Sequence, residues 1–310
     1  MQTEPLFSAI IIFYNAEQFL REAIDSVLSQ TEESWELLLV DDGSKDGGEE
    51  IARGYADRIP EKIRYLQHPD RRNQGMSAAR NLGVRNSRGE WIAFLDADDM
   101  WLPMKLAKQK ELLSSHKEAG LLYGSYMYWS SWSSELTKAT DFHPGISVPP
   151  NTLVHPPDLM LLNYPLGEGP APSMSDLVVR RAVVDQVGGF EESFSGMYQM
   201  YEDQAFLAKV YITTPAFVSG QCWSYYRQTP TSCTAVNQAA GNYHEIRRFF
   251  LEHLEQYLRT HHDRNPLIWR ALRRAIWPYR HPYLSKINAL SRGGLRRFRR
   301  FLPNRSATTL

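Results

Sequence analysis

Short apolar runs that alternate with helical patterns constrain the fold of this chain more than any other feature. The runs "SAIIIFY" (8–14), "WELLLV" (35–40) and "WIAFL" (91–95) are continuous, rich in strand-forming residues and too short for helices. Strands that are apolar on both sides are typical of a parallel sheet covered on both faces. The N-terminal third therefore predicts an α/β fold with a mostly parallel, Rossmann-like sheet flanked by helices. The other elements expected here are helices at 15–28, 47–58 and 75–86 and a strand at 62–68.

The remainder of the chain is less regular. Residues 123–134 predict a strand that leads into an aromatic loop, and prolines and glycines make 141–173 irregular. The stretch "SDLVVRRAVVDQVGGF" predicts a strand and a helix with a glycine stop, and "YEDQAFLAKVY" (201–211) opens another helix. From about Ala239 the pattern is helical only, with breaks near Pro266 and 278–282. The domains expected are a first one at 1–235, in halves of about 1–115 and 116–235, and a basic helical extension at 236–310.

The formal net charge of zero conceals an asymmetry. Residues 264–310 hold twelve Lys/Arg and no Asp/Glu, which leaves 23 basic residues against all 35 acidic ones elsewhere. Such a separation points to a polyanionic partner. Within 264–305, "LRRFRRFL" (295–302) has apolar residues at helical spacing between arginines, as in a helix that lies in an anionic membrane interface. Packing of this helix on the acidic body is an equally open alternative, and no nucleic-acid recognition motif accompanies the charge.

Cysteine usage and the absence of long apolar segments bear on location. Cys222 and Cys233 form no disulfide framework and no CxxC motif, which favours free thiols in a reducing cytosol. Residues 1–8 lack the build of a signal peptide, and the longest apolar runs are too short to cross a bilayer. We therefore expect a cytoplasmic protein, peripheral on the inner face of the cell membrane if its basic tail binds lipid.

Polar residues directly follow three of the expected strands. Asn15 follows the first and is expected to cap the next helix, with Gln18 as its reciprocal partner. Asp41 and Asp42 follow the second, and the acids of 96–99 follow "WIAFL". Because ligands bind outside the carboxyl ends of the strands in an open parallel sheet, these groups are expected on one rim. An anionic rim of this kind requires a cation or many hydrogen-bond donors.

Asp96 and Asp98 indicate what the rim could hold. In extended chain, residues two apart point the same way, so both carboxylates would face one point. Oxygen ligands suit Mg²⁺ or Mn²⁺, whose shell is completed by water and substrate phosphates. No His/Cys spacing for zinc occurs nearby. A solvated acidic turn that caps the helix at Pro103 is the alternative, and "DADD" alone does not separate the two interpretations.

The motifs "AIIIFYNAEQFLREAIDSVLSQT", "ELLLVDDGSKDG", "NQGMSAARNLG" and "EWIAFLDADDMWLP", in this order, resemble glycosyltransferase family 2. Further on, "VVRRAVVDQVGGFEESF" and "YEDQAFLAKVY" look like the acceptor-side segment and the ED motif of that family. The resemblance covers roughly 6–232. It implies a GT-A fold and an enzyme that moves a sugar, with inversion, from a nucleotide-diphosphate sugar, a UDP-sugar before others, to a glycan or lipid-linked acceptor.

On the donor side, the resemblance gives five positions a role. It makes Asp41 a contact to the nucleobase, beside the backbone near Tyr14. It makes Arg80 a contact to the base or the phosphates. Asp96 would meet the ribose or the metal, and Asp98 the metal itself. Mg²⁺ or Mn²⁺ is the cofactor that this implies.

On the acceptor side, the resemblance makes Asp203 the catalytic base. Inverting transfer is an in-line displacement that needs a base near the acceptor hydroxyl and a cation on the leaving diphosphate, which supports that role. Glu202 is expected to orient rather than react, and the pair could instead be helix N-terminal acids. Trp129 and Arg227 are further candidates for acceptor contact or orientation. Tyr126, Tyr128 and Trp132 could stack on a sugar or pack in a wall.

Two positions depart from the pattern of the family. Phe13 stands where many members have proline, a mild change in the wall beside the nucleobase. Thr229 stands where a histidine is common, so any help that histidine gives to the metal or diphosphate must come from elsewhere.

Three other functions compete with a glycosyltransferase. A dehydrogenase would carry GxGxxG after the first strand, where this chain has "FYNAEQF". A nucleotidyltransferase shares the sheet and the metal chemistry but usually carries an early glycine-rich, basic loop. A non-catalytic binding module of the same fold is the third, and intact Asp96, Asp98 and Asp203 argue against it.

Overall fold

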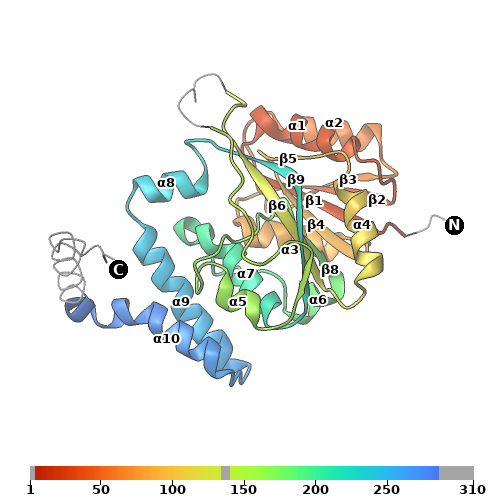
Figure 1. Ribbon diagram of the computed structural model, residues 1–310. Helices are drawn as coiled ribbons and strands as arrows, with labels where there is room; N and C mark the ends of the chain where they lie inside the picture. Colours follow the sequence, from red (N-terminus) through yellow and green to blue (C-terminus); the bar gives the residue numbers. More distant parts are fainter. Residues whose placement is uncertain (1–3, 134–139, 286–310) are drawn as a thin grey trace, which may run out of the picture. The chain divides into compact units, whose positions relative to one another are not determined.

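The structure is a computed structural model that describes residues 4–133 and 140–285. The chain divides into two compact units, Met1–Phe250 and Leu251–Leu310. The first unit therefore extends beyond the boundary expected near residue 235. In this unit a central sheet is covered by helices, which confirms the α/β prediction (Figure 1).

Nine strands of the described chain form one sheet in the order β3-β2-β1-β4-β8-β6-β9-β5, with β7 paired to β9. The pairs among β3, β2, β1 and β4 are parallel, whereas β8 pairs antiparallel with both β4 and β6. Outside this N-terminal part, β6 and β9 also pair parallel, and the whole sheet is mixed. The strands are β1 Phe7–Phe13, β2 Trp35–Asp41, β3 Ile63–Gln67, β4 Trp91–Asp96, β5 Met100–Trp101, β6 Leu121–Trp129, β7 Thr152–Val154, β8 Val178–Arg180 and β9 Ala216–Arg227.

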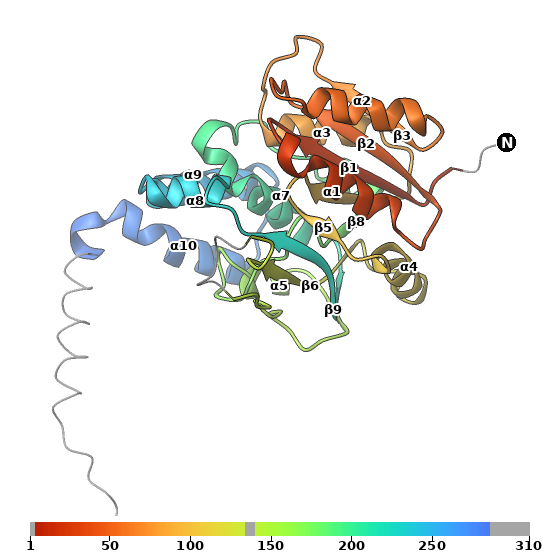
Figure 2. The same cartoon turned by 90° about the horizontal axis from the view of Figure 1, so that it is seen from above.

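Helices cover both faces of the parallel part. Phe7, Ala9 and Ile11 of β1 belong to one core with the apolar faces of α1 and α2, while α3 lies against the other face (Figures 1 and 2). At Gly83 of α3, a Cβ atom would lie 2.6 Å from the Ile10 side chain, so only glycine permits this close approach. The helices are α1 Glu17–Leu28, α2 Gly48–Arg58, α3 Met76–Asn86, α4 Lys105–Ser115, α5 Asp158–Leu162, α6 Arg181–Gln186, the 3₁₀ helix η2 Gly196–Tyr201, α7 Glu202–Tyr211, α8 Cys233–Ala239, α9 Tyr243–Thr260 and α10 Pro266–Arg280.

The strand order places a binding crevice beside β1. The chain runs outward from β1 to β2 and β3, then returns through α3 to β4 on the other side of β1. The order of strands reverses there, and such a point leaves an opening outside the carboxyl ends of the strands. Asp96 ends β4 at this opening.

The capping prediction for Asn15 is wrong. Helix α1 begins at Glu17, its N-cap is Ala16, and no side chain caps it. Asn15 has a positive φ of 51° and reaches across to the loop after β2, where its Oδ1 accepts from Lys45 N (2.8 Å) and its N–H donates to Ser44 Oγ (3.0 Å). A tertiary contact between two rim loops therefore replaces the local cap, since asparagine tolerates this backbone conformation.

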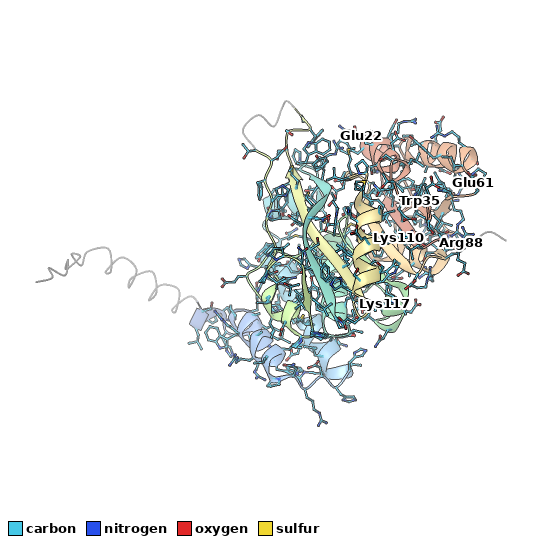
Figure 3. All side chains as sticks on the ribbon, turned by 45° about the vertical axis from the view of Figure 1, so that its right-hand side comes forward. Glu22, Trp35, Glu61, Arg88, Lys110 and Lys117 are labelled. Atoms are coloured by element: carbon cyan, nitrogen blue, oxygen red, sulfur yellow. The ribbon has the colours of Figure 1, made fainter. Side chains whose placement is uncertain are left out.

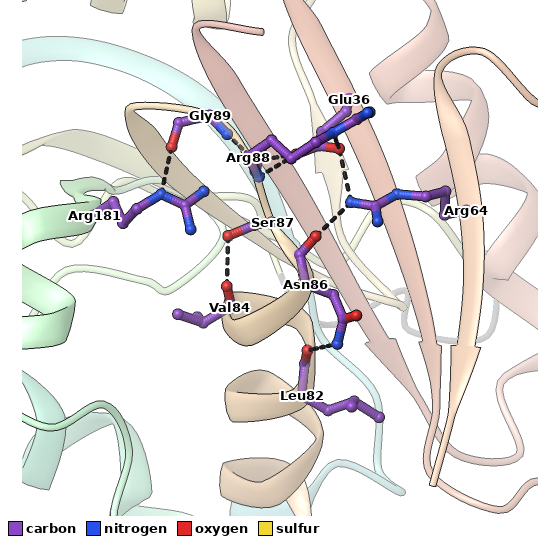
Figure 4. Close-up of polar contacts among 10 residues, drawn as sticks. Glu36, Arg64, Leu82, Val84, Asn86, Ser87, Arg88, Gly89 and Arg181 are labelled. Carbon is purple, nitrogen blue, oxygen red and sulfur yellow. Dashed lines mark hydrogen bonds and ion pairs between the residues drawn. The ribbon is translucent and has the colours of Figure 1, made fainter. Parts of the chain in front are cut away.

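A paired ionic cluster lies at the opposite, amino end of the sheet (Figure 4). Glu36, near the start of β2, is buried and accepts from Ser8 Oγ (2.6 Å) and Arg88 N (2.5 Å). Its Oε2 accepts from Arg64 Nη2 and Arg88 Nε, each at 2.9 Å. Burial would raise the pKa of Glu36, but these hydrogen bonds and the nearby charges hold it below its ordinary value.

The second unit is described as far as residue 285. Asn265 caps α10 by accepting from Leu267 N (3.0 Å), and Pro266 follows at the first helical position, as the sequence breaks predict. Helix α10 ends at Arg280, which pairs with Glu255 of α9. The predicted helix at 295–302 lies outside the described residues. Among the residues that are described, no helix combines the length and apolar character needed to cross a membrane.

Candidate active site

A cavity of about 1040 Å³ opens at the carboxyl ends of β1 and β4. Its walls come from the loop after β1, from α3, from the turn after β4, and from the first turn of α7. Residues of β6, of β9, of the segment 164–174, of η2 and of α8 with the loop before it also line it. Segments from both halves of the first unit thus enclose one space.

Arg80 connects the two sides of this cavity. It projects from α3, is 2% exposed, and donates to Asp96 Oδ1 at the end of β4 (2.7 Å) and to Glu202 Oε1 on α7. Its guanidinium is therefore engaged by two carboxylates. Arg80 thus bridges Asp96 at the end of β4 and Glu202, the residue before Asp203.

The three acids after β4 have different environments. Asp96 and Asp98 line the cavity, whereas Asp99 is buried and accepts from Ser175 Oγ (2.5 Å) and Arg227 N (2.9 Å). Burial and the Asp96 carboxylate raise the pKa of Asp98 to about 6. Asp99 therefore fixes the turn to the sheet, and Asp96 and Asp98 face the space that a ligand could occupy.

Arg227 holds the same turn from behind. Its Nε donates to the Asp98 carbonyl oxygen (2.6 Å) and its Nη2 to Glu22 Oε2 (2.5 Å), on the exposed face of α1 (Figure 3). The guanidinium lies over the rings of Trp129 at 4.4 Å and Phe19 at 4.5 Å. Neither Arg227 nor Trp129 is among the residues that line the cavity. Their positions suit orientation of the Asp98 turn and not acceptor contact.

The structure places the two acids after β2 differently. Asp41 is 2% exposed, and its carboxylate accepts from Ser44 N (2.8 Å) and the Tyr65 hydroxyl (2.9 Å). Asp42 lines the cavity and accepts from Gln74 N (2.8 Å) and Gly75 N (2.9 Å). The sequence placed both acids on the rim and the resemblance gave the contact to Asp41, whereas Asp42 and not Asp41 lines the cavity, since consecutive residues at a strand end point to opposite sides. Tyr14, 48% exposed, lines the cavity as expected.

Asp203 occupies the first turn of α7 and lines the cavity across from the β4 turn. It accepts from Gln204 N (2.7 Å). Burial raises the pKa of Asp203 to about 6, although the Arg80 charge opposes that rise. A carboxylate of this kind is ionised at neutral pH and is a stronger base than an ordinary aspartate, which suits proton abstraction.

The carboxylate oxygens at the turn after β4 are suitable ligands for a hard cation. Asp96 and Asp98 offer oxygen only, and a cation beside Asp98 would remove a repulsion between two carboxylates. Within the described part of the chain, no group of three or more His, Cys, Asp or Glu could hold a metal by itself. Two carboxylates with phosphate and water are the usual arrangement for Mg²⁺.

The two departures noted in the sequence both line the cavity, Phe13 beside Tyr14 and Thr229 after β9. Both cysteines are free, as expected. Cys233 lies in the cavity wall, and burial raises its pKa. A protonated thiol there is a weak nucleophile.

Part of this sequence is similar to known proteins. Residues 8–157 match the model of "Glycosyl transferase family 2". Over 125 residues the chain is 41% identical to an uncharacterised glycosyltransferase of Rickettsia felis, a match that covers 39% of this chain and 20% of that protein. The chain spans between 17% and 42% of the length of the curated relatives that it matches.

Solved structures show the same fold at low identity. TarS of S. aureus in complex with UDP-GlcNAc superposes with a TM-score of 0.60 at 20% identity, covering 79% of this chain and 65% of that one. Mannosyltransferase PcManGT from Pyrobaculum calidifontis, in complex with GDP-Man and Mn²⁺, gives a TM-score of 0.54 at 17% identity, with 95% and 81% covered. The fold is therefore that of GT-A glycosyltransferases, and the part of the chain that matches glycosyltransferase family 2 is residues 8–157.

Proposed function

We propose that this chain is an inverting, metal-dependent glycosyltransferase that uses a nucleotide-diphosphate sugar, a UDP-sugar before others. The acceptor is a hydroxyl of a glycan or of a lipid-linked glycan. One observation carries the proposal: Asp96, Asp98 and Asp203 line one cavity, and Arg80 joins Asp96 to the residue that precedes Asp203. The common lining supports a cation-binding edge and a base that share a single space.

In the proposed mechanism, Asp203 accepts the proton of the acceptor hydroxyl while that oxygen attacks the anomeric carbon. Asp96 and Asp98 would hold Mg²⁺ or Mn²⁺, which supplies positive charge to the leaving diphosphate. Glu202 holds Arg80 in place, and Arg80 in turn reduces the negative charge near Asp203. The Arg227 contact keeps the Asp98 turn in its conformation.

The nucleotide-sugar complexes of TarS and PcManGT support the choice of donor class, and the Mn²⁺ of PcManGT supports the choice of cofactor. Both proteins are distant in sequence, so the nucleobase and the sugar of the donor must be identified by experiment. A panel of UDP-, GDP- and dTDP-sugars, assayed for released nucleotide with Mn²⁺, identifies the donor.

Thermal shift of the full chain tests donor and metal binding together. UDP plus Mn²⁺ is expected to raise the Tm, and Asp98→Ala is expected to lose the part of that rise that depends on Mn²⁺. An unchanged rise in Asp98→Ala contradicts the metal assignment. Binding without turnover of any donor would instead favour a non-catalytic module, and pyrophosphate release from a nucleoside triphosphate would favour a nucleotidyltransferase.

For the C-terminal region we propose attachment to the inner face of the cell membrane. The support is compositional: residues 264–310 hold twelve cations and no acid, and each cation near an anionic surface contributes about 1 kcal/mol. Co-sedimentation with anionic vesicles compares the full chain with one that ends at Asn288. Equal, weak binding by both chains contradicts the proposal.

A further inference from the structure

A cluster of three tyrosines forms part of the cavity wall. Tyr126 and Tyr128 of β6 lie with ring centroids 5.3 Å apart, and Tyr226 of β9 lies 5.8 Å and 5.4 Å from them. All three line the cavity. Adjacent strands β6 and β9 carry these residues, so the cluster is rigidly held.

This tyrosine cluster shares the cavity lining with Asp96, Asp98 and Asp203. Arg227, the residue after Tyr226, donates its backbone N–H to Asp99 (2.9 Å), so β9 carries Tyr226 to the turn after β4. Burial, and then the charges of Asp99, Asp96 and Asp98, raise the pKa of Tyr226. An acceptor that presents a hydroxyl to Asp203 would therefore lie against these rings.

The charges that line the cavity are almost all negative. They comprise six carboxylates and one guanidinium, and that guanidinium, of Arg80, is already bound by Asp96 and Glu202. No lysine or histidine occurs among the described residues of the lining. A divalent cation would be offset by the donor diphosphate that it binds. Asp203 and Glu168 remain as negative charges on the acceptor side, and Tyr128 and Tyr164 add rings but no positive charge.

We infer that the acceptor unit bound in this cavity is an uncharged sugar ring packed against the cluster of Tyr126, Tyr128 and Tyr226, and that sugars with a phosphate or carboxylate beside the reacting hydroxyl are disfavoured. The inference rests on the proposed function and narrows its acceptor class. Aromatic rings pack against the apolar face of a neutral pyranose without needing a counter-charge. An anionic sugar would meet carboxylates with no unpaired cationic side chain in the described lining to offset its charge, and like charges repel.

The transfer step needs no reactant besides the donor, the acceptor and Asp203. The acceptor oxygen forms a bond to the anomeric carbon as the bond from that carbon to the diphosphate oxygen breaks. The hydroxyl proton goes to Asp203, and the electron pair leaves with the nucleoside diphosphate. An anionic group beside the hydroxyl would hinder this step, because it opposes the loss of the proton and the growth of negative charge on the oxygen.

The test uses the full chain, its best UDP-sugar and Mn²⁺. Nucleotide release is measured first without an acceptor and then with matched acceptor probes. The probes are p-nitrophenyl glucoside, galactoside and N-acetylglucosaminide, each beside its uronide or 6-phosphate. At least one neutral probe is expected to accelerate release, with kcat/KM at least tenfold above its anionic counterpart. Equal or better use of the anionic probes overturns the inference, as does failure of every neutral probe while donor hydrolysis proceeds. No nucleotide release from any donor contradicts the proposed function instead.

Two variants examine the charge and the rings separately. Glu168→Lys is expected to reduce the preference for the neutral probe several-fold, whereas Glu118→Lys, the same change on the exposed turn before β6, leaves it unaltered. Tyr128→Leu is expected to raise the KM for the neutral acceptor by more than the KM for the donor. An equal effect of the two Glu→Lys changes, or a Tyr128→Leu effect confined to kcat, contradicts the inference.

Discussion

Buried carboxylates at the two ends of this sheet have opposite electrostatic environments. At the amino end, Glu36 accepts four hydrogen bonds, from Ser8, Arg64 and Arg88, and its pKa is lowered. At the carboxyl end, the pKa of Asp98 and the pKa of Asp203 are both raised to about 6, chiefly by burial. A buried carboxylate thus stabilises the fold at the amino end. At the carboxyl end, hydrogen bonds and charges do not fully offset the cost of burying Asp98 and Asp203.

The difference separates structural acids from reactive ones. A buried carboxylate with a full set of donors contributes to stability, whereas one without them is retained at a cost and commonly marks a functional site. Asp99 shows that a raised pKa alone does not mark a reactive acid, because burial raises the pKa of Asp99 well above its ordinary value although two donors lie within 3 Å. The predictions below test this contrast at individual residues.

The largest expected effect concerns Asp203. Asp203→Asn should lower the transfer rate by about 10²-fold or more, because it removes the general base. Binding of UDP and Mn²⁺, measured by calorimetry, should persist. In the wild type, kcat/KM should fall as the pH drops below about 6, since the base is then protonated.

Asp185→Asn is a matched control, because Asp185 is exposed on α6. It should leave both the rate and the pH profile unaltered. Normal turnover in Asp203→Asn would move the base to another residue, with Glu202, which also lines the cavity, next in order. Retention of the pH profile in a slowed Asp203→Asn enzyme would assign the titration elsewhere.

Glu36→Gln should cost about 1–3 kcal/mol in the free energy of unfolding, because it weakens hydrogen bonds to a charged, buried acceptor. The pKa of Glu36 is lowered from 4.5, so its stabilisation is present above that pH and is lost as the pH falls further. Urea denaturation of both proteins between pH 3 and pH 7 should therefore show a gap that narrows at acid pH. Glu111→Gln, in an exposed pair with Lys108, should change stability little. A gap that stays constant with pH would mean that Glu36 acts through packing alone.

The sequence predicted local elements well because their signals are local. The first two strands were predicted to within one residue, since a continuous apolar run followed by a turn defines both the strand and its end. The helix at α7 and the acids in its first turn were likewise evident from spacing. Asp96, Asp98 and Asp203 were expected near one another on chemical grounds, and they line one cavity.

Contacts between distant segments could not be predicted in this way. Arg80 binds residues 16 and 122 positions away, and Arg227 joins Glu22 to the Asp98 turn across the sheet. The choice of Asp42 over Asp41 as a cavity residue depends on the loop that supplies Gln74 and Gly75 as donors. No periodicity or spacing in the chain encodes these pairings.

Arg227→Ala should weaken binding of Mn²⁺, in the presence of UDP, by about tenfold, because the Asp98 turn loses a donor that fixes its carbonyl oxygen. Arg227→Lys should recover part of the affinity, since a cation stays over Trp129 and Phe19. Glu22→Gln removes only the exposed partner of Arg227 and should have a small effect. Isothermal titration measures all three. An effect of Arg227→Ala on Tm with unaltered Mn²⁺ affinity would reduce Arg227 to a packing role.

The smallest expected effect is a gain in stability. Asp98→Asn should raise the free energy of unfolding by about 1 kcal/mol at neutral pH in EDTA, because it removes a repulsion between neighbouring carboxylates that the apo protein does not compensate. With UDP and Mn²⁺ present the order should reverse, since the wild type then gains binding energy that the variant lacks. The corresponding change at the amino end of the sheet, Glu36→Gln, should destabilise the protein under both conditions. If Asp98→Asn destabilises the protein in EDTA as Glu36→Gln does, then Asp98 is a structural acid, and the contrast between the two ends of the sheet does not hold at this residue.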